Sequence, residues 1–277
     1  YTPTHTLSLH DALPICFLFL RFGSGLLPLA VIFRRSFARI DSRALREGVI
    51  TGIALFFAYA FLNWGLVYTT TAKAGFIIGL RVILVPITGA LLFRLRAAPL
   101  SWIASFVSLC GLAFIFFGEF DPPLSLNPGD VLMVASAFFF ALHVLLVSRY
   151  VVRENYIPLL LLQITTVVLI SGAGSLVFES GPIPGRNEVW GSALLAGLFS
   201  TALAFWLMNR FQESTTPDRA GVIFSSEPLF AALFGFIFLG ERLHGWQWAG
   251  AALIVAAMLL ASAGGPGRQD KNQASGK

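Results

Sequence analysis

Nine long apolar segments limit the fold of this chain more than any other feature of its sequence. Each is close to the roughly 20 apolar residues that an α-helix needs to cross a bilayer. They cover residues 16–33, 48–69, 74–93, 99–118, 130–148, 156–178, 189–209, 220–240 and 245–263. The links between them are short and rich in polar residues, proline or glycine, so no soluble domain fits. We therefore predict an all-α membrane protein with nine transmembrane helices.

The composition excludes an ordinary water-soluble domain. Charged residues make up 12% of the 277 residues, whereas soluble domains carry roughly 25%. The hydrophobic share of 56% is more than a water-soluble core can hold, so part of it must face lipid. The formal net charge of +5 does not indicate nucleic acid, because the basic residues lie mainly in the links between apolar segments.

Motifs typical of enzymes are absent from the sequence. It contains no His-Glu-x-x-His, no Gly-x-Ser-x-Gly and no Gly-x-x-x-x-Gly-Lys-Ser/Thr. Cys16 and Cys110 both lie in apolar segments without the spacing of metal ligands. We predict no enzymatic activity, no cofactor and no metal site.

Both ends of the chain lie outside the predicted helices. Residues 1–15 are polar, and residues 8–15 resemble a translated sequencing adapter. One interpretation is a non-native segment that replaces a first transmembrane helix; the other is a short native tail. Residues 264–277 are polar and glycine-rich, and we predict that they form a disordered tail.

Lysine and arginine gather in alternate links, which sets the predicted orientation. Fourteen of them fall on one side, and three, Lys73, Arg186 and Arg242, fall on the other. The positive-inside rule assigns the richer side to the cytoplasm. We predict a multi-pass protein of the bacterial inner membrane with a cytoplasmic C-terminus.

The sequence also repeats itself at a distance of 146 residues. Ten positions between residues 58 and 102 are identical in the second copy, including Asn63 with Asn209, Ala74-Gly75 with Ala220-Gly221, Arg96 with Arg242, and Trp102 with Trp248. The distance spans five predicted helices, so the second copy enters the membrane inverted. Inverted repeats are typical of secondary transporters, with the solute site near the bilayer midplane. We predict a 5+5 inverted-repeat bundle of ten helices, with four visible in a first repeat (16–118) and five in a second (130–263).

Two parts of the repeat carry a family resemblance. Residues 220–232 contain Glu227-Pro228 and are followed by Gly240-Glu241, while the first copy contains residues 74–80 and Val85-Pro86. These stretches resemble the EamA-type branch of the drug/metabolite transporter superfamily over about residues 16–263. The departures are the absent first helix and the charged Arg81.

The resemblance implies a permease or exporter that moves a small metabolite or drug-like solute by alternating access. Its partners would be that solute and the lipid bilayer, with a proton or cation as a coupling ion. A homodimer stays open, and no nucleic acid is expected. The competing interpretation is an intramembrane scaffold or enzyme-associated subunit without transport activity.

Ionisable residues inside the predicted helices need a partner or a function, because each costs roughly 2.5–3.5 kcal/mol at a helix centre. Arg81 and Glu227 occupy the same position in the two copies. They form either a structural ion pair or a functional site, in which Glu227 beside Pro228 holds a proton or cation. Arg81 would then bind an anionic group of the solute or reach toward an interface.

Further polar and aromatic residues are candidates for a solute or coupling-ion site. These are Tyr59, Asn63, Trp64, His143, Trp206 and Asn209, with Pro86 and Pro228 as predicted helix breaks. The alternative for His143 is a packed, hydrogen-bonded histidine, and for the Asn and Trp residues it is helix–helix bonding or interfacial anchoring. Arg21 lies near the start of a predicted helix, which favours an interfacial position. A single cavity lined by Arg81, Glu227 and the Asn and Trp residues would favour the transporter.

Overall fold

The fold was analysed in a computed structural model, which describes residues 14–116, 127–151, 155–179, 187–240 and 244–263. All regular structure in these residues is helical. Eight helical segments are long and apolar enough to cross a membrane, and Pro99–Ile115 is a shorter apolar helix. Each of the nine predicted segments is therefore found as a helix, and the chain is a multi-pass membrane protein. The inverted relation of the two copies stays a prediction.

Each of the nine segments forms one helical rod, and six of these rods are continuous helices. They are α1 (Pro14–Ile32), α2 (Ser42–Leu66), α5 (Pro99–Ile115), α6 (Pro128–Tyr150), α7 (Tyr156–Phe178) and α12 (Gly245–Ala263). A short 3₁₀ helix, η1 (Arg34–Arg39), joins α1 to α2. α2 begins before the predicted residue 48 because the Asp41 side chain caps it, accepting a hydrogen bond from the Ala44 N–H at 2.7 Å.

Two rods are interrupted near their middle. α3 (Thr71–Gly79) gives way to α4 (Arg81–Phe93) at Leu80, and α10 (Pro217–Phe224) gives way to α11 (Glu227–Leu239) at residues 225–226. Leu80 and Ser226 are separated by the repeat distance, so the two interruptions fall at matching positions. Each rod starts with a threonine cap, Thr70 or Thr216, whose side chain accepts a backbone N–H.

The two prolines predicted as helix breaks lie in different places. Pro228 is in the first turn of α11, where its missing N–H leaves no intrahelical bond unmade. Pro86 lies inside α4, which continues through it. The first rod breaks at Leu80 instead, directly after Gly79, whose low helix propensity favours an end there.

The ninth rod is irregular in a different way. It consists of α8 (Asn187–Leu195), a π-helix η2 (Ala196–Leu203) and α9 (Ala204–Gln212). Gly197 in η2 and Gly25 in α1 bring the two backbones together, since a Cβ on Gly25 would lie 2.6 Å from the Gly197 carbonyl oxygen. A π-helical segment re-aims the side chains that follow it and is frequent at functional sites.

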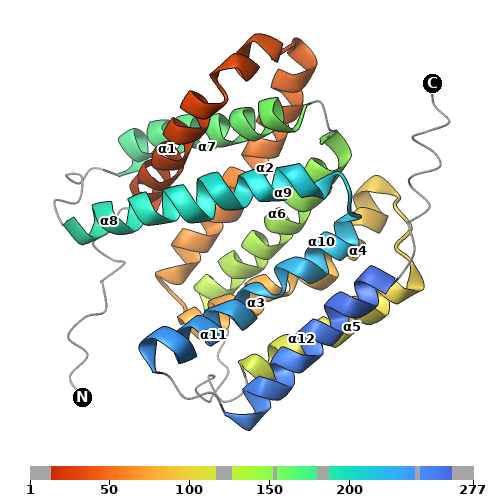
Figure 1. Cartoon of the computed structure of the whole chain (residues 1–277). Coiled ribbons are helices and arrows are strands. Elements are labelled where there is room, and N and C mark those ends of the chain that lie inside the picture. The colour runs from red at the N-terminus through yellow and green to blue at the C-terminus, as the bar shows by residue number, and fades with distance from the viewer. Residues whose placement is uncertain (1–13, 117–126, 152–154, 180–186, 241–243, 264–277) are drawn as a thin grey trace.

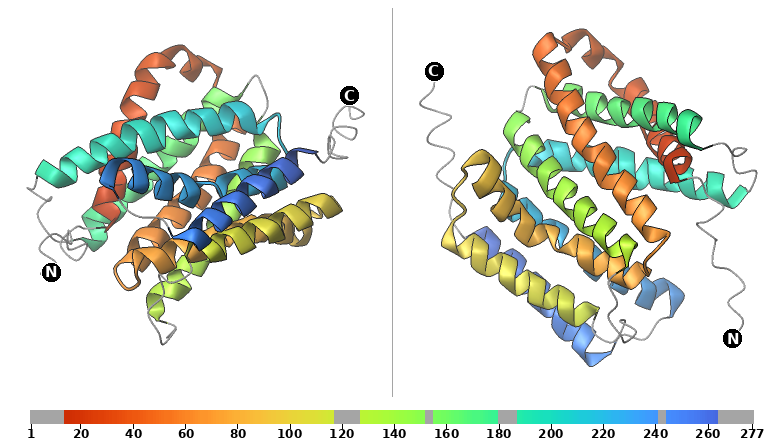
Figure 2. Two further views of the ribbon diagram at one scale, coloured as in Figure 1. Left: turned by 60° about the horizontal axis from the view of Figure 1, so that its bottom comes forward. Right: turned by 180° about the vertical axis from the view of Figure 1, so that it is seen from behind.

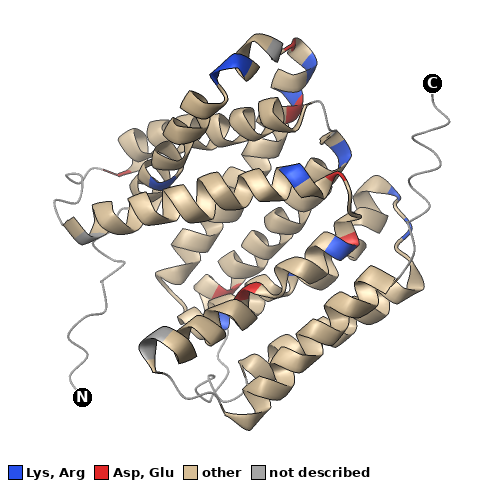
Figure 3. Cartoon of the chain, viewed as in Figure 1, with Lys and Arg blue, Asp and Glu red and all other residues tan. Residues whose placement is uncertain are grey.

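The helices form one bundle in which the broken rods run between two groups. Figure 1 shows α5 and α12 paired along one side and α1, α2 and α7 on the opposite side, and Figure 2 shows the same arrangement from two other directions. The largest buried cluster joins α1, α2 and α7 through residues such as Leu18, Leu55 and Ile164. In Figure 3, long stretches of uncharged ribbon separate the charged residues, as expected for helices that cross lipid.

α5 and α12 pack backbone against backbone. A Cβ on Gly111 would lie 2.8 Å from the Gly250 carbonyl oxygen, and a Cβ on Gly250 would lie 2.6 Å from the Gly111 carbonyl oxygen. Glycine permits this approach, which is a common way for helices to associate in lipid. The buried residues Ala104, Leu112 and Ile254 extend the contact along both helices.

The predictions for the chain ends fall largely outside the described residues. Of the predicted non-native segment 1–15, only Pro14 and Ile15 are described, and both belong to α1. The predicted disordered tail 264–277 lies outside the described residues entirely.

Candidate functional site

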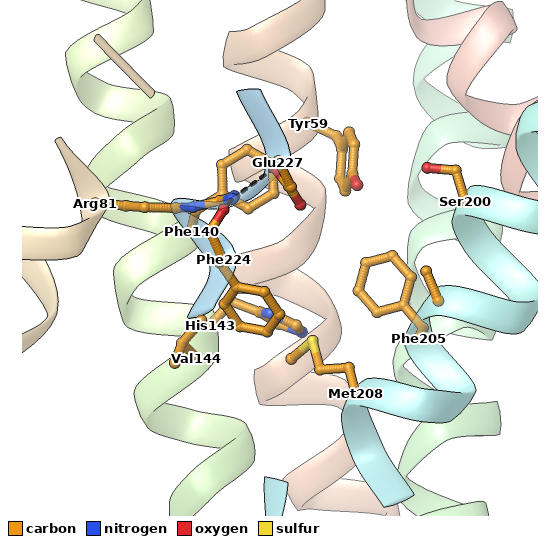
Figure 4. A pocket seen from close by; sticks show the side chains of 11 residues that line it. Tyr59, Arg81, Phe140, His143, Val144, Ser200, Phe205, Met208, Phe224 and Glu227 are labelled. Carbon is orange, nitrogen blue, oxygen red and sulfur yellow. Dashed lines mark hydrogen bonds and ion pairs between the residues drawn. The ribbon is translucent and has the colours of Figure 1, made fainter. Parts of the chain in front are cut away.

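A cavity lies where the two broken rods meet α2, α6 and the η2–α9 rod. It has two adjoining parts of ≈ 110 Å³ and ≈ 330 Å³. Both parts share six lining residues: Tyr59, Arg81, Phe140, Ser200, Phe224 and Glu227. Figure 4 shows the smaller part, with the Arg81 and Glu227 side chains joined on one side of it and Ser200 and Phe205 on the opposite side. The cavity therefore draws its walls from both copies of the predicted repeat.

Arg81 and Glu227 form an ion pair at the two helix interruptions. Arg81 is the first residue of α4, and Glu227 is the first residue of α11. The Arg81 Nη2 atom donates to Glu227 Oε2 at 2.6 Å. The Arg81 side chain is 9% exposed and the Glu227 side chain is 66% exposed, so the arginine is inside the bundle while the carboxylate faces the open part of the cavity.

The end of α10 supplies the second hydrogen bond of Arg81. Phe224 is the last residue of α10, so its carbonyl has no partner within that helix, and Pro228 four residues later has no N–H to offer. Arg81 Nη2 donates to this carbonyl oxygen at 2.9 Å. Its guanidinium also lies over the Phe140 and Phe224 rings, at 5.7 and 5.5 Å from their centroids. Arg81 is therefore held by a carboxylate, a freed carbonyl and two aromatic faces.

His143 belongs to a buried chain of side-chain hydrogen bonds. Its Nε2 atom lies 2.8 Å from Gln163 Oε1, Gln163 Nε2 donates to Asn209 Oδ1 at 3.1 Å, and Asn209 Nδ2 donates to the Phe205 carbonyl at 2.9 Å. A carbonyl can only accept, so it fixes the direction of every bond in the chain. His143 must then donate from Nε2. The alternative of a packed, hydrogen-bonded histidine describes this geometry, and the ring also lines the cavity.

Arg21 enters the cavity from α1, although the sequence favours an interfacial position for it. Its Nη2 atom donates to Ser200 Oγ at 2.9 Å and to Tyr59 Oη at 3.3 Å, and its Nε atom donates to Thr201 Oγ1 at 3.3 Å. The guanidinium lies 4.6 Å from the Tyr59 ring centroid. Ser200 and Thr201 belong to η2, so the close approach of α1 to the π-helix positions this arginine.

Comparison with known protein families identifies the family of this chain. The model of the EamA-like transporter family matches residues 1–117 and 127–263. The chain belongs to the EamA-like transporter family. It is therefore a membrane transporter, whose partners are a solute and the lipid bilayer.

Relatives of this EamA-like chain carry the same general description. Two proteins of Archaeoglobus fulgidus, both described as uncharacterized transporters, are similar to it. One is 33% identical over 217 residues, which are 78% of this chain and 68% of that protein. The other is 26% identical over 260 residues, which are 90% of this chain and 88% of that protein.

A solved crystal structure has a similar fold. It matches with a TM-score of 0.75 at 20% identity and covers 92% of this chain and 89% of its own. At that identity the likeness concerns the EamA-like fold alone. It agrees with the all-helical bundle described above.

Four of the predicted candidates, Tyr59, Arg81, His143 and Glu227, line the EamA-like cavity, and the other four do not. Asn209 is in the hydrogen-bond chain, and Asn63 Nδ2 donates to the Pro14 carbonyl at 3.3 Å. Trp64 is exposed, and Trp206 Nε1 is buried with no hydrogen-bond partner among the described residues. A role of these four residues in solute binding stays a prediction.

Several lining residues of the EamA-like cavity were missed from sequence. The apolar ones include Phe140, Val144, Phe205, Met208 and Phe224, and the polar ones include Arg21 and Ser200. The phenylalanines carry no signal of their own in a chain with 27 of them. Arg21 had a signal, because it lies two helical turns inside its helix, but its direction does not follow from the sequence.

Proposed function

We propose that this EamA-like protein is a secondary transporter that moves a small metabolite or drug-like solute through the cavity by alternating access. The observation that carries the proposal is the meeting of two rods, interrupted at matching positions of the repeat, at a cavity with charged walls. Interrupted helices that surround a site between repeats are a recurrent design of secondary transporters. The alternative, a scaffold without transport, gives no reason for charged side chains at such a cavity.

The predicted inverted repeat supports alternating access. Two similar halves of opposite topology can exchange conformations, and the exchange converts an inward-open state into an outward-open one. Both halves contribute to the walls of the cavity, with Arg81 from the first copy and Glu227 from the second. A cytoplasmic C-terminus in a bacterial inner membrane is part of this proposal, and the basic links support the cytoplasmic side.

Within this mechanism the Arg81–Glu227 pair acts as a latch between the two broken rods. The charge-assisted hydrogen bond at 2.6 Å joins the first residue of α4 to the first residue of α11. Opening the pair would separate α4 from α11 and change access to the cavity. Coupling to a proton or cation is the competing role of Glu227.

Counterflow in liposomes tests the proposal. The purified chain is reconstituted with a panel of unlabelled metabolites inside, and entry of the same labelled solutes is measured. We expect exchange for at least one solute, with Glu227→Gln changing its rate and Glu213→Gln, at an exposed position away from the cavity, leaving it unchanged. Absence of exchange for every solute in folded protein would contradict transport and favour the scaffold.

A further inference from the structure

We infer that the cavity receives a solute with a carboxylate or a similar anionic group, and that Arg21 holds this group. The inference rests on the proposed function, because it names the solute class for the same cavity. It begins from the charge balance of the lining residues. Arg21, Arg81 and Glu227 give the described walls two positive charges and one negative charge.

Arg21 differs from Lys73, Arg43 and Arg81 in its partners. Lys73, Arg43 and Arg81 each have a carboxylate oxygen within 2.9 Å. Among the described residues, Arg21 has no carboxylate within salt-bridge distance and contacts only hydroxyl groups and aromatic rings. Hydroxyl groups orient a guanidinium but do not neutralise it, and an uncompensated charge within a membrane span is costly. A solute anion would supply the missing charge.

The hydroxyl contacts leave one nitrogen of the guanidinium, Nη1, available. Nε binds Thr201, and Nη2 binds Ser200 and Tyr59. No hydrogen bond joins Nη1 to any other residue in the described part of the chain. These contacts fix the plane of the group before a solute arrives, and the two N–H groups of Nη1 stay available to donate to a carboxylate.

The rest of this part of the cavity fits a non-polar body. Leu62, Ile78 and Phe140 line the same ≈ 330 Å³ space as Arg21. Arg81 and Glu227 line it too, but their ion pair balances the charges of both groups at that end. The anionic group therefore belongs at the Arg21 end, with the apolar part of the solute against these three side chains. Such a mixture of apolar walls and a few polar groups is typical of small-molecule sites.

Matched probes that differ only in charge test this inference. Thermal unfolding of the purified protein is followed with N-acetylleucine against N-acetylleucinamide, and with 3-phenylpropionate against 3-phenylpropionamide. We expect the carboxylate of at least one pair to stabilise the wild-type protein at concentrations about tenfold lower than its amide. Arg21→Gln should remove this difference. Arg34→Gln, which removes an exposed arginine from η1, should keep it.

Further variants and flux measurements separate this inference from the proposed function. Arg21→Lys keeps the charge but not the guanidinium that the hydroxyl groups orient, so it should retain a smaller preference for the carboxylate. This variant serves if Arg21→Gln does not fold. Equal responses to both members of each pair, or an unchanged preference in Arg21→Gln, would overturn the anion site. If liposomes exchange the amides as fast as the carboxylates, the anion site is overturned while the proposed transport function stands. Carboxylate binding that needs Arg21, without exchange of any solute, would support the anion site and contradict transport.

Discussion

The Arg81 guanidinium and the Glu227 carboxylate meet at 2.6 Å, and the 146 residues between them are the period of the internal repeat. Equivalent positions of two copies are thus in direct contact, as happens for residues close to a two-fold axis. Opposite charges at these positions attract, whereas the same charged residue in both copies would place two like charges in contact, and these would repel each other. The ion pair between the two copies therefore depends on their having different residues, Arg81 and Glu227, at this one position.

The first prediction concerns this ion pair. Glu227→Gln removes the charge beside a buried arginine, so we expect the free energy of unfolding in detergent to fall by about 1–3 kcal/mol. Arg81→Gln together with Glu227→Gln should restore part of the loss, because no unpaired charge then stays buried. Thermal unfolding of the four proteins of the cycle measures this coupling.

The same four proteins distinguish the latch from ion coupling. A latch predicts that the double variant recovers transport relative to Glu227→Gln. If Glu227 instead carries the proton, the single variant folds normally and loses the pH dependence of transport, with no recovery in the double variant. Strictly additive stability losses would show that the pair contributes no coupling energy.

The second prediction concerns the chain from His143 to Asn209. Gln163 is fully buried and bonds to both residues. Gln163→Leu leaves two buried polar groups without their partner, and we expect the free energy of unfolding to fall by about 1–3 kcal/mol. Gln163→Glu keeps an acceptor for His143 and loses the donor to Asn209, so it should also destabilise. A neutral result for Gln163→Leu in thermal unfolding would show that the chain is not needed for stability.

The third prediction concerns the contact of α5 with α12. Gly111→Ala places a methyl group about 2.8 Å from the Gly250 carbonyl oxygen, and a backbone atom cannot move aside as a flexible side chain can. We expect the free energy of unfolding to fall by about 1–3 kcal/mol. Gly191→Ala is the matched control, since a Cβ there would meet no atom within 4 Å. It should be neutral or stabilising by up to about 1 kcal/mol, and an equal loss in both variants would contradict the close contact.

The fourth prediction concerns topology. Four helical rods of the structure precede Asn127 and five follow it, so the two ends of the second group lie on opposite sides of the membrane. Reporters fused after Asn127 and after Lys277 should therefore give opposite signals, with Lys277 cytoplasmic. Matching signals at the two sites would contradict the number of membrane crossings.

The sequence predicted the features that follow from apolar length and repeat spacing. It missed the positions of helix interruptions and the directions in which side chains point. Apolar length predicted all nine rods, and the repeat singled out Arg81 and Glu227 as equivalent positions. It did not predict the interruption at Leu80, since Pro86 is the stronger local signal and α4 accommodates it. The inward direction of Arg21 depends on η2, whose π-helical turn has no sequence signature among its apolar neighbours. On a helix that is apolar on every side, the packing against neighbouring helices decides in which direction a given side chain points.

No carboxylate among the described residues neutralises Arg21, so its charge would also couple this cavity to the membrane potential. An elementary charge that crosses a membrane potential of about 100 mV changes its free energy by about 2.3 kcal/mol. A rearrangement that carries Arg21 through part of the field would therefore speed up or slow down with voltage. The closed Arg81–Glu227 pair would not respond in this way, because its two charges would move together.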